Sequence, residues 1–129
     1  MFCDLVMSKG ELIVELKSKN TTTTIKDITP AGVRLEFNAE GEVKGSFNAA
    51  QMETVSVLAK SDGTNEWEAK VIEMTKDGDM VIAMSKGTGG QESPTVGRFE
   101  GDVTFQTSSK KLAWLNTTKR LLRSTPRSN

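Results

Sequence analysis

The residue types that perform most enzyme chemistry are scarce in this chain. Its 129 residues include no His and a single Cys, Cys3. Pairs of Ser or Cys with His, the usual zinc ligand sets and an intrachain disulfide are excluded, because each needs an imidazole or a second thiol. Acid-base chemistry would have to come from an Asp, Glu or Lys whose pKa is moved by burial. Glu73 is the candidate for that role, and we predict no other catalytic residue.

Other motifs that could bind an ion are better explained as structure. The glycines at 87–90 lack the Lys-Ser/Thr of a phosphate loop. The acidic residues from Asp62 onward have an approximate calcium-loop spacing, but Trp67 stands where that loop needs Gly. Asp77 and Asp79 flank Gly78, as Asp does in ordinary turns. We therefore predict no metal site and no cofactor.

The charges balance overall but are segregated along the chain. There are 17 basic and 17 acidic residues, whereas the segment from Val103 onward has six basic residues and no acidic one. The cluster at 119–123 could meet acidic lipid or nucleic acid, but no aromatic residue lies among its charges to stack on a base. We predict neither a membrane nor a nucleic acid as partner, and we expect residues 119–129 to be a basic, disordered tail.

No run of apolar residues approaches the ~20 that span a bilayer. The first residues, 1–7, lack the basic leader and the long apolar run of a signal peptide. We therefore expect a cytoplasmic protein.

Hydrophobic residues alternate with a period of two along most of the chain, which is typical of strands. Breaks between strands are predicted at the polar run 18–20, at a tight Glu-Gly hairpin at 40–41, at two Asp-Gly turns and in a flexible glycine-rich loop at 87–97. The predicted strands are residues 12–16, 21–28, 33–39, 43–47, 52–60, 66–75, 80–84, 98–106 and 112–116.

One of these strands changes its apolar face. Trp67, Ala69 and Val71 share one parity, whereas Ile72 and Met74 have the other. A β-bulge near Val71 would reset the alternation, and we predict one there, beside Glu73.

Eight or nine short strands at hairpin spacing, without a convincing helix, indicate an antiparallel barrel or sandwich. A barrel is favoured because Gly45 and Gly101 interrupt apolar faces, as tight curvature requires. We predict an all-β fold, a single antiparallel up-and-down barrel of about eight strands with little or no helix, over residues 1–118.

Three stretches carry a resemblance to a known family. They are the strand at 54–58 with its Asp-Gly-Thr-Asn-Glu-Trp hairpin, the glycine-rich segment leading into 97–101, and residues 109–116 with the sequence Leu-Ala-Trp-Leu-Asn. Residues 28–118 thereby resemble an uncharacterised microbial family of small β-barrels, which is similar to calycin and allene oxide cyclase-like barrels. The resemblance implies a closed antiparallel barrel and no established reaction.

The family's barrels would continue past Asn116 into a closing strand, where this chain turns basic instead. Either the strand at 12–16 closes the barrel or an open edge remains. Because an open edge favours pairing with a second copy, we predict a homo-oligomer.

An eight-stranded barrel is either filled by its own side chains or has room for one small ligand. We favour a non-enzymatic barrel that binds a hydrophobic or amphipathic small molecule. One alternative is an allene oxide cyclase-like isomerase or cyclase that acts by confinement and uses Glu73. Another is an oligomeric interaction module with a solid core. The residues predicted to line the interior are Phe47, Trp67, Phe99, Phe105 and Trp114.

Overall fold

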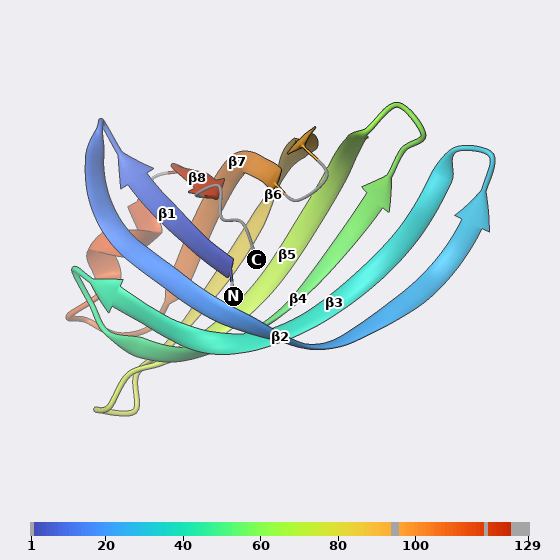
Figure 1. Ribbon diagram of the computed structural model, residues 1–129. Helices are drawn as coiled ribbons and strands as arrows, with labels where there is room; N and C mark the ends of the chain where they lie inside the picture. The colour runs from blue at the N-terminus through green and yellow to red at the C-terminus, as the bar shows by residue number, and fades with distance from the viewer. Residues whose placement is uncertain (1, 94–95, 118, 125–129) are drawn as a thin grey trace.

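The computed structural model describes residues 2–93, 96–117 and 119–124. Eight antiparallel strands follow one another in chain order around a closed barrel, and β1 pairs with β8 to complete it (Figure 1). The elements are β1 (Phe2–Ser8), β2 (Glu11–Thr29), β3 (Gly32–Gly45), β4 (Ala49–Ala59), β5 (Thr64–Met74), β6 (Met80–Ser93), β7 (Val96–Thr107), the 3-10 helix η1 (Ala113–Thr117) and β8 (Arg120–Ser124).

The predicted all-β, up-and-down barrel with little helix is confirmed. In the described part of the chain, no helix is long and apolar enough to cross a membrane. Both Asp-Gly turns form where they were predicted. Gly63 and Gly78 take positive φ angles of 88° and 85°, and their amides donate to the carbonyls of Lys60 and Thr75.

The barrel is closed along only part of its length. β8 pairs with β1 through residues 121–124 and with β7 through residues 120–123. Beyond this closure, residues 20–29 of β2 and 96–99 of β7 have a neighbouring strand on one side only, as far as the described residues go. The β2–β3 hairpin therefore projects well past the closed half (Figure 1).

The C-terminal segment differs from the expected disordered tail. Arg120–Ser124 form β8, with Arg120, Leu122 and Ser124 buried and the residues between them exposed. Its alternation was hidden in the sequence because two of the three inward positions are polar. Residues 125–129 lie outside the described residues. The strand predicted at 12–16 does not close the barrel. It is part of β2, which pairs with β1 and β3, and the closure is made by β1 with β8.

Three predicted breaks are wrong. β2 runs unbroken through 18–20, β3 runs through 40–41, and β6 and β7 take up most of 87–97. Of residues 112–116, predicted as a strand, all but the first instead belong to η1. Polar and glycine residues were interpreted as strand ends, whereas here they lie within long strands, with Ser18 at a buried position.

Glycine allows neighbouring backbones to approach closely where the sheet bends. A Cβ on Gly41 would overlap the carbonyl of Lys17 on β2. Gly87 and Gly101 lie opposite each other on β6 and β7, and a Cβ on either would overlap the other strand's backbone. Gly45, with a φ of 139°, also lies against β2. These positions have the role in curvature that the sequence assigned to Gly45 and Gly101.

The predicted bulge near Val71 is absent. β5 keeps an unshifted register with β4 and β6 along residues 65–74. Trp67, Ala69, Val71 and Glu73 therefore all point inward and are buried. Ile72 and Met74 point outward and are exposed.

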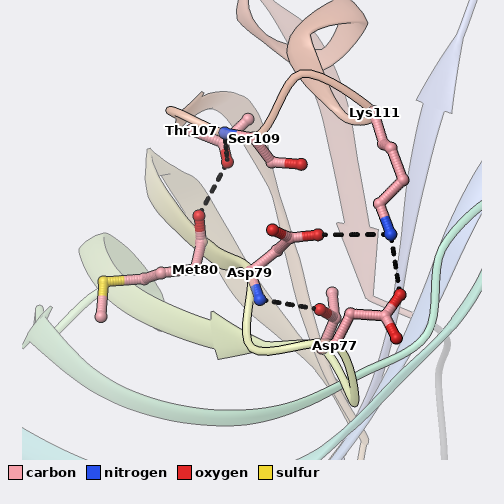
Figure 2. A network of polar contacts seen from close by, with 7 residues as sticks. Asp77, Asp79, Met80, Thr107, Ser109 and Lys111 are labelled. Carbon is pink, nitrogen blue, oxygen red and sulfur yellow. Dashed lines mark hydrogen bonds and ion pairs between the residues drawn. The ribbon is translucent and has the colours of Figure 1, made fainter.

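A polar network fastens the segment before η1 to the β5–β6 turn (Figure 2). Lys111 Nζ lies 2.7 Å from Asp77 Oδ2 and 3.7 Å from Asp79 Oδ2. Thr107 Oγ1 donates to the carbonyl of Met80 at 2.7 Å. These contacts hold the chain where Leu112 and Leu115 enter the core, both of them buried.

Candidate functional site

Carboxylic acids point into the barrel, an environment that normally excludes them. Asp4 on β1, Glu53 on β4 and Glu73 on β5 lie on the inward faces of their strands, and Glu73 is fully buried. Burial disfavours the ionised form of an acid, so these groups keep their protons at higher pH than in water. The barrel therefore holds weak acids in its interior.

Glu73 is the most perturbed of the three. Burial and, second, the nearby charge of Glu53 raise its pKa from 4.5 to about 8. Neither oxygen of its carboxyl group has a hydrogen-bond partner among the described residues. A neutral Glu73 at pH 7 can both donate and accept a hydrogen bond.

Gln51 lies directly across the β4–β5 ladder from Glu73. Its side chain is 5% exposed, and neither its amide nitrogen nor its oxygen has a partner among the described residues. Native proteins satisfy the large majority of buried polar atoms, because leaving one unpaired costs about 1–3 kcal/mol. Two adjacent side chains with four unsatisfied atoms are a marked exception.

Glu53 connects the acids electrostatically. Burial raises its pKa, while a hydrogen bond from Ser18 Oγ at 3.2 Å lowers it. The same carboxyl group contributes to the raised pKa of Asp4, about 7, of which burial is the larger cause. Since an ionised Glu53 disfavours ionisation of Asp4 and Glu73, the protonation of the three acids is linked. We call Asp4, Gln51, Glu53 and Glu73 the interior polar cluster.

The geometry of this cluster does not favour a metal. Within residues 2–93, 96–117 and 119–124, no three His, Cys, Asp or Glu side chains converge on a point where they could hold an ion. The buried cation Arg120 is engaged elsewhere, because it donates to the carbonyls of Leu115 at 2.7 Å and Trp114 at 3.2 Å. The cluster can supply hydrogen bonds, protons and, at higher pH, negative charge.

The five aromatic residues predicted to line the interior do not form one wall. Phe47 and Phe105 pack edge to face at 6.3 Å, and Trp67 and Phe99 do the same at 6.3 Å. Phe99 and Phe105 are six positions apart along β7, so the two pairs occupy different levels of the barrel. Trp114 lies on η1, is 40% exposed and stacks with Arg120. That the five bind a ligand stays a prediction.

Beyond Trp67 and Phe99, the inner face continues onto the projecting β2–β3 hairpin. Phe37 packs against the core, and Leu35 and Val33 share its face of β3. Across the ladder on β2, Leu35 pairs with Ile25 and Val33 pairs with Ile28, and these two isoleucines are 64% and 71% exposed. The open half of the barrel thus presents an uncovered apolar surface that leads toward the interior.

Sequence reasoning found Glu73 but missed the rest of the cluster. Gln51, Glu53 and Asp4 were not singled out from the sequence. One signal was available: on the strand at 52–60, the inward parity of Val55 and Val57 extends back to Glu53 and Gln51.

The fold and the site define a small up-and-down β-barrel with uncompensated acid and amide groups inside. No family model and no curated protein matches the chain. Solved structures share the fold. One from Clostridium acetobutylicum, a protein with unknown function, has 18% identity and a TM-score of 0.76, covering 90% of this chain and 96% of its own.

Two further structures are similar along nearly their whole length. A conserved protein of unknown function from Rhodopseudomonas palustris has 16% identity and a TM-score of 0.70, covering 98% of this chain and 97% of its own. A β-barrel-like protein from Acinetobacter baumannii has 15% identity and a TM-score of 0.65, covering 92% and 99%. At these identities the likeness concerns the fold alone, and the similar structures are themselves of unknown function or described only by their shape.

Proposed function

We propose that the barrel binds an amphipathic small molecule whose polar end carries a hydrogen-bond donor or a positive charge. The observation that carries this proposal is the pair Glu73 and Gln51, buried cross-strand neighbours with no partner among the described residues. A bound polar group that reaches both would supply the missing hydrogen bonds.

The acidic character of the cluster decides which polar end fits. Glu53 and Asp4 are acids of the same sign as Glu73, so an anionic headgroup would add repulsion in a low-dielectric space. A positively charged amine would instead favour the ionised carboxylates and offset their burial. A neutral alcohol or amide could still donate to either side chain.

The apolar part of such a molecule would lie along the inner face of the open half. Trp67 and Phe99 stand between the closed half and the hairpin surface of Ile25 and Ile28. Covering those exposed side chains would contribute about 25 cal/mol for each Å² removed from water. Ligand sites commonly combine such an apolar lining with a few convergent polar groups.

Dodecylamine, dodecanol and laurate test this proposal, because they share a chain length and differ in headgroup. The readout is Trp67 fluorescence in a Trp114→Phe background, which leaves one Trp in the chain. We expect dodecylamine and dodecanol to change the Trp67 emission at concentrations below micelle formation, and laurate to bind more weakly. Binding of the amine should tighten as the pH rises through the Glu73 pKa of about 8.

Glu73→Gln and Glu68→Gln are the matched variants. Both lie on β5, but Glu68 points outward and is exposed. Glu73→Gln should weaken binding of the amine at high pH by about tenfold or more and remove its pH dependence, whereas Glu68→Gln should do neither. Equal binding of laurate and dodecylamine, or amine binding unaffected by Glu73→Gln, would overturn the proposal.

A second function is favoured by one specific observation. A carboxyl group with a pKa of about 8 is protonated near neutral pH and can act as a general acid. This property fits an isomerase or cyclase that works by confinement. The allene oxide cyclase-like barrels, which the sequence resembles, are of this kind. The hypothesis includes affiliation of the chain with calycin-like barrels. Turnover of an amphipathic substrate that is lost in Glu73→Gln, while binding of dodecanol is retained, would support it over binding alone.

We also propose that the protein works in the cytoplasm. With the single cysteine Cys3, the chain cannot use an oxidising compartment to form an internal disulfide. Recovery of the protein in the membrane or secreted fraction of cells would contradict this location.

A further inference from the structure

The outer face of the barrel carries a concentrated apolar surface at one end of three adjacent strands. β4, β5 and β6 lie side by side (Figure 1). Their outward side chains at this end are 39% to 62% exposed. We call this surface the β4–β6 patch, and it consists of Met52, Ile72, Met74, Met80, Ile82 and Met84.

The strand register makes the patch continuous. Met52 lies opposite Ile72, and Ile72 lies opposite Ile82. Met74 lies opposite Met80 in the neighbouring row. Directly opposed residues have Cβ atoms about 4.5–5.5 Å apart, so these side chains are neighbours on one surface.

The same strands are polar outside the patch. The next outward residues along β5 and β6 are charged and exposed. They are Lys70, which lies opposite Met84, and then Glu68, Glu66 and Lys86. The outer surface of the barrel is therefore not apolar in general. The uninterrupted β5 register confines the apolar residues to one area, which monomeric proteins avoid unless the area is used.

We propose that the β4–β6 patch is the interface of a two-fold symmetric homodimer. Its six side chains present on the order of 500 Å² of apolar surface, near the upper end for the largest patch on a typical monomer. Packed face to face, two patches with their polar rims would bury roughly 1,200–1,600 Å² in total, which is the size of a stable specific interface. One patch alone can thus supply what a dimer needs.

The surroundings of the patch favour a second copy over a membrane. Glu40 and Glu42 on β3 lie beside Met52 and Ala50 and are exposed. The rim is mixed in sign, because Lys44 lies 3.5 Å from Glu42 and the exposed Lys70 lies opposite Met84. A mixed rim lets two copies pair opposite charges and offers anionic lipid headgroups no basic cluster. Two copies of a chain with zero formal net charge have no overall repulsion to overcome.

The composition of the patch also fits a self-complementary surface. Ile72 and Met74 on β5 form its centre, with methionine or isoleucine on both neighbouring strands. A two-fold axis running along β5 would place the β4 side of one copy on the β6 side of the other. Four of the chain's six methionines are in the patch, and their flexible side chains can adapt to one another.

Light scattering coupled to size exclusion tests this proposal with the full chain at about 1–100 µM. We expect a dimer in this range. Ile72→Lys places two charges at the centre of the interface, one from each copy, and should weaken dimerisation at least about 100-fold. Thr88→Lys adds the same charge to the outward face of β6, outside the patch, and should leave the dimer intact. Met52→Lys provides a second variant in case Ile72→Lys lowers expression.

Peroxide oxidation provides an independent readout. Met52 and Met80 should oxidise several-fold more slowly in the dimer than in the Ile72→Lys monomer, because the interface covers them. A wild-type protein that stays monomeric across the concentration range would overturn the proposal, as would a dimer unaffected by both Lys substitutions. A monomer that binds neutral phosphatidylcholine vesicles through Met52 and Ile72 would also overturn it, in favour of a lipid surface. The ligand experiment above reads the inner face, so either proposal can fail alone.

Discussion

Ile72 and Glu73, consecutive residues of β5, place an exposed isoleucine on the outside of the barrel and a fully buried carboxyl group on the inside. Ordinary half-buried strands have the opposite arrangement. A bulge that exchanged the two faces would remove both anomalies, yet β5 stays in register with both neighbours through this point. The unshifted ladder thus places Glu73 in the interior polar cluster and Ile72 in the β4–β6 patch. Glu73 lacks a hydrogen-bond partner among the described residues, and the patch leaves apolar side chains exposed.

The acid inside the barrel predicts a stability that falls as the pH rises. The folded-state pKa of Glu73 is raised from 4.5 to about 8. Below 4.5 the carboxyl group is neutral in both the folded and the unfolded chain, so burial is not penalised there. Between 4.5 and about 8 the folded protein binds the extra proton, so the free energy of unfolding decreases with pH and levels off above about 8. The loss should be on the order of 3–5 kcal/mol, at about 1.4 kcal/mol for each pKa unit.

Glu73→Gln keeps the shape and removes the titration. Urea unfolding across this pH range should give a flatter stability profile for Glu73→Gln than for the wild type, and a more stable protein at high pH. Asp4→Asn should act in the same direction, because its pKa is raised to about 7. Glu68→Gln, at an exposed position of the same strand, is the control. A wild-type profile that rises from pH 5 to 8 would show that Glu73 is not buried as described.

Close contact between β2 and β3 predicts a sharp difference between two glycines. A Cβ on Gly41 would overlap the backbone of Lys17 and Ser18, whereas a Cβ on Gly90 would meet only one atom, at an ordinary 3.7 Å. Gly41→Ala should therefore lower the free energy of unfolding by about 3 kcal/mol through forced separation of the strands. Gly90→Ala should leave it within about 0.5 kcal/mol. Denaturant unfolding of the two variants at one pH checks this, and similar stabilities would contradict the close approach.

Some parts of this structure could be predicted from the sequence, and others could not. The Asp-Gly turns at 62–63 and 77–78 depend on local conformational preferences, so their positions were predictable. The barrel class followed from the period-two pattern. The length of β2 did not, because Ser18 is a buried polar residue, and polar residues were interpreted as strand ends.

The rest of the interior polar cluster and β8 were hidden for the same reason. Period-two analysis assigns polar residues to the outside, and Gln51 and Arg120 are polar residues on the inside. Only the register with neighbouring strands fixes which way they point. Sequence patterns therefore fail most at the positions where this barrel departs from an ordinary core, and Gln51 of the candidate site is one of them.

The buried guanidinium of Arg120 predicts that β8 and η1 are stabilised together. Besides its bonds to the carbonyls of Leu115 and Trp114, Arg120 lies 5.8 Å from the centre of the Phe105 ring and 5.6 Å from that of Trp114. Arg120→Met would leave carbonyl groups without donors and should lower the free energy of unfolding by about 2–4 kcal/mol. Arg120→Lys should not restore it, because one ammonium group cannot reproduce the planar fork.

Arg123→Met is the matched control for this loss, since Arg123 is an exposed residue of the same strand. Thermal melts followed by near-UV circular dichroism would detect the release of Trp114 as well as the loss of stability. If Arg120→Met and Arg123→Met melt together, Arg120 does not hold η1 against the barrel.

The ion pairs of Lys111 make the attachment of η1 sensitive to salt and acid. Asp77 lies in a fully exposed turn, and the hydrogen bond and charge of Lys111 lower its pKa from 3.8. A lowered folded-state pKa means that the pair stabilises the protein above 3.8 and loses its effect as the pH falls through the folded value. Lys111→Met should reduce the melting temperature by at most a few degrees near pH 7, since exposed pairs contribute little. That difference should disappear in about 1 M salt and again below the Asp77 pKa.

Lys110→Met, at the exposed position next to Lys111, should melt like the wild type under all of these conditions. A deficit in Lys111→Met that persists in high salt and in acid would mean that Lys111 acts by packing its methylene stem against the β5–β6 turn, and the ion pairs would then not explain how η1 is held.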